Sequence, residues 1–459
     1  MTPILSTDHG KVYKGDCRDV LKQFPNNYFT GVLTDPPYGL EFMGKKWDKL
    51  DTRQPGDPNY KTNDTPGGRS KVRFSSAASY GGSVGKLIEE WHYSWAKEAF
   101  RVCKPGGFML AFGGSRTHHR LMSGIEDAGW EIRDTFQWWY ATGFPKSLDI
   151  ARAIDKVERG VPQGRPDPTS PNHGRYKPGS SGAGPGSYMA EKGENNDREL
   201  VEAAKKWTGY GTAVKPAYEP IVVAMKPVDG TFVNNALTHG LAGINIDASR
   251  IPTSEPGGRP KREVHEQRED VEYDGSSLEG RVDGSLQSSK AVGTTDNGRW
   301  PTNVILSHSP ECDDRCVPGC PVRELNEQSG DTFSTRSDGN PNEPVYRKVP
   351  DQPMSWGGIR KTHDFRDTGG ASRFFYIAKV SKSERDGSKH PTIKPIALME
   401  YLAKMLAPPE NAMFLDLFLG SGTTGIACEK LGYDWVGIDL DCSEAIPRLK
   451  KRTQQRGLW

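Results

Sequence analysis

The chain has 459 residues, and 61 basic residues against 59 acidic ones leave a formal net charge of only +2. This balance neither requires nor excludes a polyanionic partner, because a local basic face is sufficient to bind one. There is no apolar run of about 18 residues and no basic-then-apolar leader, so we expect no membrane association and a cytoplasmic location. The seven cysteines are then expected to be reduced thiols or metal ligands and not a disulfide framework.

Strands and helices are predicted to alternate along the chain. The hydrophobic patterns predict strands at 11–15, 28–34, 108–113, 131–140, 219–227, 413–418 and 434–440. They predict helices at 19–24, 87–103, 118–129, 399–406 and 423–432, with Gly106 and Gly107 closing the second helix after Pro105. Seven strands alternating with helices indicate an α/β fold whose mostly parallel sheet is covered on both faces.

The sequence TDPPYG (34–39) follows the second predicted strand. Asp-Pro and Pro-Pro are ordinary turn signals after a strand, and this is the simplest interpretation. The alternative is a rigid rim, because proline rings fix the backbone on both sides. Such a rim would hold the carboxylate of Asp35, the carbonyl of Pro36 and the aromatic face of Tyr38 towards one flat ligand.

A glycine-rich loop lies between the last predicted strand–helix pair. Gly420, Gly422 and Gly425 have G-x-G-x-x-G spacing, and Asp439 ends the next strand, which is the pattern of a nucleotide-binding turn. A dinucleotide is disfavoured, because the carboxylate of Asp416 directly before the loop would repel a pyrophosphate. S-adenosylmethionine has an amino group and a ribose but no phosphate, so it suits this loop, with Asp439 bound to the ribose hydroxyls.

These two motifs together predict methyl transfer to an exocyclic amine. The lone pair of such an amine is delocalised into the base, so two acceptors on its hydrogens would favour attack on a methyl sulfonium. Asp35 and Pro36 supply one acceptor each, and Tyr38 supplies a stacking face. The predicted catalysis is therefore alignment and preorganised electrostatics, without a strongly shifted base.

The sequences DPPY (35–38), DLFLGSGTTG (416–425) and KHPTIKP (389–395) resemble those of the amino-methylating DNA methyltransferases, which act on adenine N6 or cytosine N4. The catalytic motif precedes the cofactor motif, which is the order of the β group of that family. The resemblance implies a seven-stranded, Rossmann-like, circularly permuted methyltransferase fold that flips its target base out of double-stranded DNA. It also implies a nucleoid-associated protein of bacterial or phage type.

The resemblance extends the predicted site. We assign Pro37 to the catalytic motif with its neighbours, and the cofactor site is implied to include Asp16, His390, Thr392, Lys394, Asp416, Phe418, Gly420, Ser421, Gly422, Thr423 and Asp439. The predicted domains are the catalytic half at 1–150, a polar insertion at 151–212, a return strand at 213–235, a target-recognition region at 236–370 and the S-adenosylmethionine-binding half at 371–459.

A cluster of soft ligands lies in the target-recognition region. His308, Cys312, Cys316 and Cys320 recur with three residues between them, and the prolines and Gly319 in this segment prevent one continuous helix. The four side chains are therefore expected to surround a point and to hold a structural Zn²⁺ ion. The alternative is a group of buried thiols beside an unrelated surface histidine.

Aspartate as the first residue of DPPY favours adenine N6 as the target, and cytosine N4 is the nearest alternative. A different class, a catalytically idle sequence-specific DNA-binding protein, is disfavoured by the intact residues Asp35, Tyr38 and 420–425. A homodimer and a restriction endonuclease partner are both compatible with the sequence, as is a methyltransferase without such a partner.

Overall fold

The computed structural model describes residues 1–38, 83–140, 147–160, 199–252, 259–263, 290–295, 298–312, 315–333, 368–379, 384, 386 and 393–454. The chain forms two compact units. Unit 1 contains Met1–Asn245, Asn303–Pro321 and Ala378–Trp459, and unit 2 contains Ile246–Thr302 and Val322–Ile377. Within the described ranges, we find no helix that is both long enough and apolar enough to cross a bilayer.

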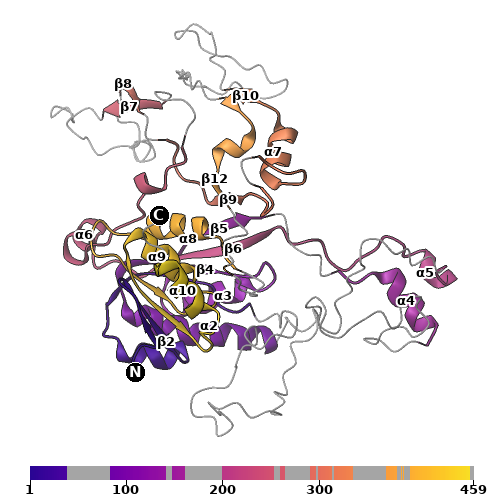
Figure 1. Cartoon of the computed structure of the whole chain (residues 1–459), viewed down its shortest axis with the longest axis horizontal. Helices are drawn as coiled ribbons and strands as arrows, with labels where there is room; N and C mark the ends of the chain where they lie inside the picture. Colours follow the sequence, from indigo (N-terminus) through magenta and orange to yellow (C-terminus); the bar gives the residue numbers. More distant parts are fainter. Residues whose placement is uncertain are drawn as a thin grey trace, which may run out of the picture. The chain divides into compact units, whose positions relative to one another are not determined.

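Unit 1 is built on a mixed sheet (Figure 1) whose central seven strands are the seven predicted ones. Their spatial order is β2 (Gly10–Lys14), β14 (Asp434–Asp439), β13 (Met413–Asp416), β3 (Phe29–Thr34), β4 (Cys103–Phe112), β6 (Tyr218–Met225) and β5 (Glu131–Trp139). Neighbours are parallel except that β6 is antiparallel to both β4 and β5. This confirms the Rossmann-like methyltransferase fold.

Three short strands extend this sheet beyond the predicted seven. β1 (Leu5–Ser6) pairs antiparallel with β2, β9 (Val304–Ser307) pairs parallel with β5, and β12 (Tyr376–Ala378) is the last strand in the order. Segments of two to four residues are too short to show an alternating pattern, so only their pairing partners reveal them as strands.

Helices cover both faces of the sheet, as its parallel strands predict. On one face, α2 (Ser83–Val102) and α3 (His118–Asp127) contribute Trp95 and Ile125 to a core with Val32, Met109 and Leu415. On the other face lies α9 (Thr423–Leu431), whose Gly425 packs on Trp435 of β14. A Cβ added at Gly425 would lie 2.5 Å from that indole, so only glycine permits this approach.

The other helices of unit 1 are α1 (Cys17–Val20), which a 3-10 turn at Leu21–Gln23 continues, α4 (Ile150–Glu158), α5 (Glu202–Lys205), α6 (Phe232–His239), α8 (Ile396–Leu406) and α10 (Ala445–Gln454). Two of them lie in the expected polar insertion. The buried carboxylate of Asp155 in α4 accepts hydrogen bonds from Arg159 and from the backbone N–H of Val201, just before α5. The described parts of that insertion therefore contain ordered helices.

The prediction that Gly106 and Gly107 end a helix is wrong. The helix ends at Val102, and β4 begins at the next residue and includes both glycines. The register with β3 shifts here, since Phe29 pairs with Cys103 but Gly31 pairs with Phe108. The Pro-Gly-Gly sequence is a bulge, and the backbone of Gly106 and Gly107 is hydrogen-bonded to Lys226 after β6.

The end of the chain joins the beginning in the sheet, as the permuted order predicts. β14 pairs with β2 over five residues, from Trp435–Gly10 to Asp439–Lys14. The buried carboxylate of Glu429 in α9 accepts hydrogen bonds from the indole of Trp435 at 2.9 Å and from the backbone N–H of His9 at 3.2 Å. One acid therefore holds both segments together.

Unit 2 has less regular structure in its described parts. It contains two antiparallel strand pairs, β7 (Arg259–Glu263) with β8 (Lys290–Thr295) and β10 (Thr332–Phe333) with β11 (Thr368–Gly369). It also contains 3-10 turns at Asp247–Ser249 and Ala371–Phe374 and most of α7 (Pro321–Ser329). Unit 2 includes 246–302 and 322–370 of the expected region 236–370, and Asn303–Pro321 groups with unit 1.

Candidate functional site

The predicted catalytic motif lies at the carboxyl end of β3, where it is fixed to the neighbouring strand β13. The hydroxyl of Thr34 donates a hydrogen bond to Asp416 Oδ1 at 2.9 Å and accepts one from the backbone N–H of Leu417. Asp35 is the next residue after Thr34. The sheet therefore brings the DPPY motif and the glycine loop to the same edge, where α/β proteins bind their ligands.

The predicted catalytic carboxylate of Asp35 lies in a group with three other side chains, and we call the four residues the catalytic cluster: Asp35, Tyr38, Glu219 and Lys394. The ammonium of Lys394 lies 2.5 Å from Asp35 Oδ2 and 3.3 Å from Glu219 Oε2. The hydroxyl of Tyr38 lies 3.0 Å from Asp35 Oδ1 and 3.1 Å from Glu219 Oε2. Two carboxylates thus share one lysine and one phenol.

Burial and charge shift the pKa values within this cluster. Burial alone would lower the pKa of Lys394, but the carboxylates of Asp35 and Glu219 outweigh it and raise that pKa. Burial raises the pKa of Glu219, and the nearby charge of Asp35 raises it further. Burial and the same two carboxylates raise the pKa of Tyr38 well above its ordinary value. Lys394 is therefore a permanent cation at neutral pH, and Tyr38 remains a phenol.

Tyr38 is held by the end of β4 as well as by the cluster. Its backbone carbonyl accepts a hydrogen bond from Thr117 Oγ1 at 3.1 Å. Its ring packs against Gly114 so closely that an added Cβ there would lie 3.2 Å from Tyr38 Cδ2. Glycine at position 114 therefore leaves the space that the aromatic ring of the motif occupies.

Aromatic side chains form a wall beside the cluster. The Lys394 ammonium lies 4.7 Å from the centre of the Phe112 ring and 6.0 Å from that of Trp138, within the range of cation–π attraction. Trp138 also packs on Tyr140, with 5.0 Å between ring centres. Trp138 is buried, and its neighbour Trp139 is 39 % exposed, as alternation along a strand predicts.

Two glycines of the glycine loop lie in the left-handed region of backbone conformation. Gly420 and Gly422 have φ values of +51° and +79°, which side chains other than glycine rarely adopt. The backbone N–H of Gly420 donates to Asp439 Oδ2 at 2.7 Å, and the mostly buried carboxyl of Asp439 has a raised pKa because of its burial. This hydrogen bond connects the loop to the end of β14.

A buried arginine stabilises the glycine loop through hydrogen bonds. Arg448 in α10 donates to the carbonyl of Ser421 at 2.5 Å and to the hydroxyl of Thr423 at 3.1 Å. It also donates to the carbonyl of Glu384 at 2.8 Å. Ser421 and Thr423 are themselves buried, and the hydrogen bond between their hydroxyls stabilises the turn together with Arg448.

Asp416 and Phe418, which were assigned to the cofactor, have contacts inside the protein. Asp416 Oδ1 accepts hydrogen bonds from Thr34 and from the backbone N–H of Phe418. Burial raises the pKa of Asp416 to about 7, although hydrogen bonds from Thr424 and Thr34 oppose the shift. The Phe418 ring packs on Trp91 and Trp95.

Asp16 also has an internal role. Its carboxylate caps α1 through the backbone N–H of Arg18 and pairs with the guanidinium of the same residue at 2.6 Å. The contacts of Lys394 place this residue in the catalytic cluster, whereas the resemblance assigned it to the cofactor pocket. His390 and Thr392 lie outside the described residues.

Glu219 is the site residue that sequence reasoning did not identify. It begins the predicted strand at 219–227, where an acid before an apolar run has no special meaning. Because β6 runs antiparallel to β4, its first residues lie at the edge where the parallel strands end. Only the direction of β6 brings Glu219 to Lys394.

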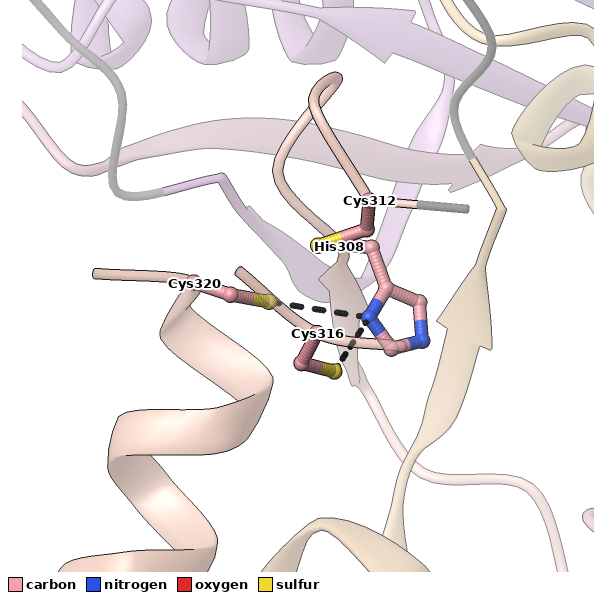
Figure 2. Close-up of side chains that lie close together, drawn as sticks. All are labelled: His308, Cys312, Cys316 and Cys320. Atoms are coloured by element: carbon pink, nitrogen blue, oxygen red, sulfur yellow. Dashed lines mark hydrogen bonds between the residues drawn. The ribbon is translucent and has the colours of Figure 1, made fainter. Parts of the chain in front are cut away.

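The predicted metal ligands do come together. Figure 2 shows the side chains of His308, Cys312, Cys316 and Cys320 turned towards one another at the end of β9. Their potential ligand atoms all lie within 4.8 Å of one another.

The fold and this site define the class of protein: a Rossmann-like methyltransferase with an acidic DPPY site beside its glycine loop. The chain belongs to the N6/N4 DNA methylase family, whose model matches residues 29–445. This confirms the resemblance seen in the sequence motifs.

Individual relatives cover smaller parts of the chain. The Type II methyltransferase M.HindIII of Haemophilus influenzae is 26 % identical over 251 residues, which are 51 % of this chain and 64 % of that protein. M.BamHI of Bacillus amyloliquefaciens is 31 % identical over 110 residues, 24 % of this chain and 19 % of that protein. The chain thus spans less than two thirds of the length of these relatives.

The solved structure of the cytosine-N4-specific PvuII DNA methyltransferase aligns over 98 % of this chain and 88 % of its own, with 13 % identity and a TM-score of 0.41.

Proposed function

We propose that this protein transfers a methyl group from S-adenosylmethionine to the N6 amine of adenine in double-stranded DNA. The observation that supports it is the catalytic cluster, in which the Asp35 carboxylate is fixed by Lys394 and Tyr38 at the sheet edge next to the glycine loop. Membership in the N6/N4 DNA methylase family and similarity to Type II methyltransferases support the reaction class. Aspartate as the first residue of the motif favours adenine.

The residues of the glycine loop fit S-adenosylmethionine. An added Cβ at Gly420 would find its nearest neighbour, the carbonyl of Phe418, at 3.8 Å, so a ligand has room to approach this backbone. The Asp439 carboxylate accepts backbone hydrogen bonds from Gly420, Leu440 and Asp441. An ionised carboxylate has about four acceptor positions, so it keeps acceptor capacity for a ribose hydroxyl. When bound, the cofactor supplies an electrophilic methyl group.

The remaining steps follow from side chains of this chain. Asp35 and the Pro36 carbonyl accept hydrogen bonds from the two hydrogens of the target amine, which frees the nitrogen lone pair for attack. The bound cofactor would supply the methyl group to this nitrogen, and Asp35 or water would take the excess proton from the methylated amine. Lys394 is a positioning residue, since its ammonium pairs with Asp35 Oδ2 and holds the orientation of that carboxylate.

Two alternatives use the same observations. Cytosine N4 carries an equivalent amine, and the catalytic cluster would act on it in the same way. An idle DNA-binding protein would keep the fold but transfer no methyl group. A homodimer and a restriction endonuclease partner are both compatible with this proposal, as is a methyltransferase without such a partner.

The test is methyl transfer from labelled S-adenosylmethionine to double-stranded DNA, followed by nucleoside analysis. We expect N6-methyladenine from the wild type, no product from Asp35→Ala, and retained S-adenosylmethionine binding in that variant. Asp19→Ala, which removes an exposed carboxylate in α1, is the matched control and should remain active. N4-methylcytosine as the product would refute the adenine assignment, and an active Asp35→Ala variant would refute the mechanism.

A further inference from the structure

We propose that His308, Cys312, Cys316 and Cys320 bind one structural Zn²⁺ ion, and that this ion fixes the end of β9 against the aromatic wall of the catalytic cluster. This inference goes beyond the proposed methyl transfer and does not depend on it. The four residues belong to unit 1, in the segment that directly precedes the part of the chain that forms α7.

Two distances between the histidine nitrogen and cysteine sulfurs match tetrahedral zinc. Zn–S bonds of about 2.3 Å and a Zn–N bond of about 2.05 Å place nitrogen and sulfur about 3.6 Å apart in a tetrahedron. His308 Nδ1 lies 3.4 Å from Cys316 Sγ and 3.6 Å from Cys320 Sγ. In Figure 2 these three atoms and the sulfur of Cys312 face one common point. Buried thiols packed only as small apolar groups would not select an imidazole nitrogen as their shared neighbour.

The donor set identifies the metal and its role. Three thiols and one imidazole form a Cys₃His set, which binds Zn²⁺ in structural sites and leaves no open position for a reacting water. All three cysteines are free thiols, so none of them is used in a disulfide. An odd number of thiols around one histidine is explained by a metal and not by disulfide pairing.

The backbone between His308 and Cys320 supports the predicted zinc ligands. The N–H of Val317 points to Cys312 Sγ at 3.5 Å, a contact that stabilises a thiolate. Gly319 has a φ of +78°, and the N–H of Cys320 donates to the Val317 carbonyl, which together turn the chain back towards His308. These contacts preorganise the loop for a cation.

The four predicted zinc ligands are connected to the aromatic wall through one buried hydrogen bond. Ser307, the residue before His308, accepts a hydrogen bond from the indole of Trp138 at 2.7 Å. β9 also pairs with β5, so that Trp138 lies opposite Ile305. Because the Trp138 ring flanks Lys394, a fixed end of β9 fixes this wall. The metal would thus position the pocket without touching the reacting atoms.

The test is metal analysis of the untagged full-length protein, purified without chelator. We expect about one zinc per chain by the one-site argument. Replacement of this zinc by cobalt should give the visible spectrum of a tetrahedral thiolate site. Cys316→Ala should lose the metal, with a loss of affinity larger than the about 10–100-fold that an outer-shell partner costs. His308→Cys should retain it, because four thiolates form an equivalent site.

The matched control is Cys103→Ala, a buried free thiol in β4 that should leave the zinc content unchanged. A folded wild-type protein that contains no zinc and gives no cobalt spectrum would refute the proposal. So would a Cys316→Ala variant with full zinc content. If that variant does not fold, the cobalt titration of the wild type decides the question, and it does so even if no methyl transfer is detected.

Discussion

Lys394 is the side chain that holds the predicted catalytic carboxylate of Asp35 in place. It is 5 % exposed and forms ion pairs with both Asp35 and Glu219. Burial and the charge of Asp35 raise the pKa of Glu219, and the Lys394 ammonium opposes this shift. Loss of the ammonium would also remove the contact that fixes the orientation of the Asp35 carboxylate.

We expect Lys394→Met to lower kcat by about 100-fold, the usual effect of removing one electrostatic contribution to a transition state. Lys394→Arg should keep more activity than Lys394→Met because it keeps the charge beside Asp35. Steady-state kinetics of the wild type and the two variants would measure this. Lys22→Met, which breaks an exposed pair with Asp19, is the control and should have little effect.

The same experiment distinguishes the two roles considered for Lys394. If it lines the cofactor pocket, as the resemblance implied, its loss should appear mainly in the affinity for S-adenosylmethionine. A normal kcat with weakened cofactor binding would therefore contradict its role as a positioning residue for Asp35.

At the scale of elements, Asp416 connects the ends of β3 and β13 with the glycine loop. Its Oδ1 accepts hydrogen bonds from Thr34 and from the N–H of Phe418. Burial raises its pKa from 3.8 to about 7. A raised pKa means that the folded protein binds this proton more tightly than the unfolded chain does. The contribution of Asp416 to stability is therefore complete below pH 3.8 and decreases until the pH passes about 7.

We expect Asp416→Asn to become more stable relative to the wild type as the pH rises from 4 to 8. The asparagine keeps an oxygen for Thr34 and Phe418 but cannot ionise. Thermal unfolding of the cofactor-free proteins across this range would measure the change, and the exposed Asp127→Asn serves as the control. If the difference in stability between Asp416→Asn and the wild type does not change with pH, ionisation of Asp416 does not destabilise the folded protein.

The main elements were predictable, because strands and helices of ordinary length carry their own hydrophobic period. The boundary between α2 and β4 was not, because Pro105 and the two glycines after it are signals for a helix end and for a bulge alike. Only the pairing of β4 with β3 and the contacts to Lys226 decide between them. β9 and β12 were missed because their few residues become strands only through their neighbours.

At the scale of the whole molecule, unit 2 exposes two aromatic rings, each beside an arginine. Trp300 is 60 % exposed and Phe374 is 43 % exposed. The guanidinium of Arg250 lies 5.5 Å from the centre of the Trp300 ring, and that of Arg373 lies 4.3 Å from the centre of the Phe374 ring. Exposed aromatic rings beside arginines are typical of surfaces that contact bases and phosphates. We therefore propose that unit 2, which includes most of the expected target-recognition region 236–370, contacts the target DNA.

We expect Trp300→Ala to raise the Kd for target DNA by about tenfold, or about 1.4 kcal/mol, without changing S-adenosylmethionine binding. Fluorescence anisotropy with labelled duplexes would measure it. The control is Trp207→Ala, which removes a tryptophan of unit 1 that is 39 % exposed, and it should have a smaller effect. Equal losses in both variants would contradict recognition by unit 2.

The sequence by itself determined the class of this protein, because DPPY, the glycine loop and the alternating strands are local patterns whose order along the chain can be read directly. The tertiary structure alone decided which charges meet. Lys394 follows Asp35 by more than three hundred residues, and Glu219 reaches both because β6 runs antiparallel to its neighbours. Coulomb interactions depend on distance in space, and the sheet order, which no local pattern specifies, sets that distance.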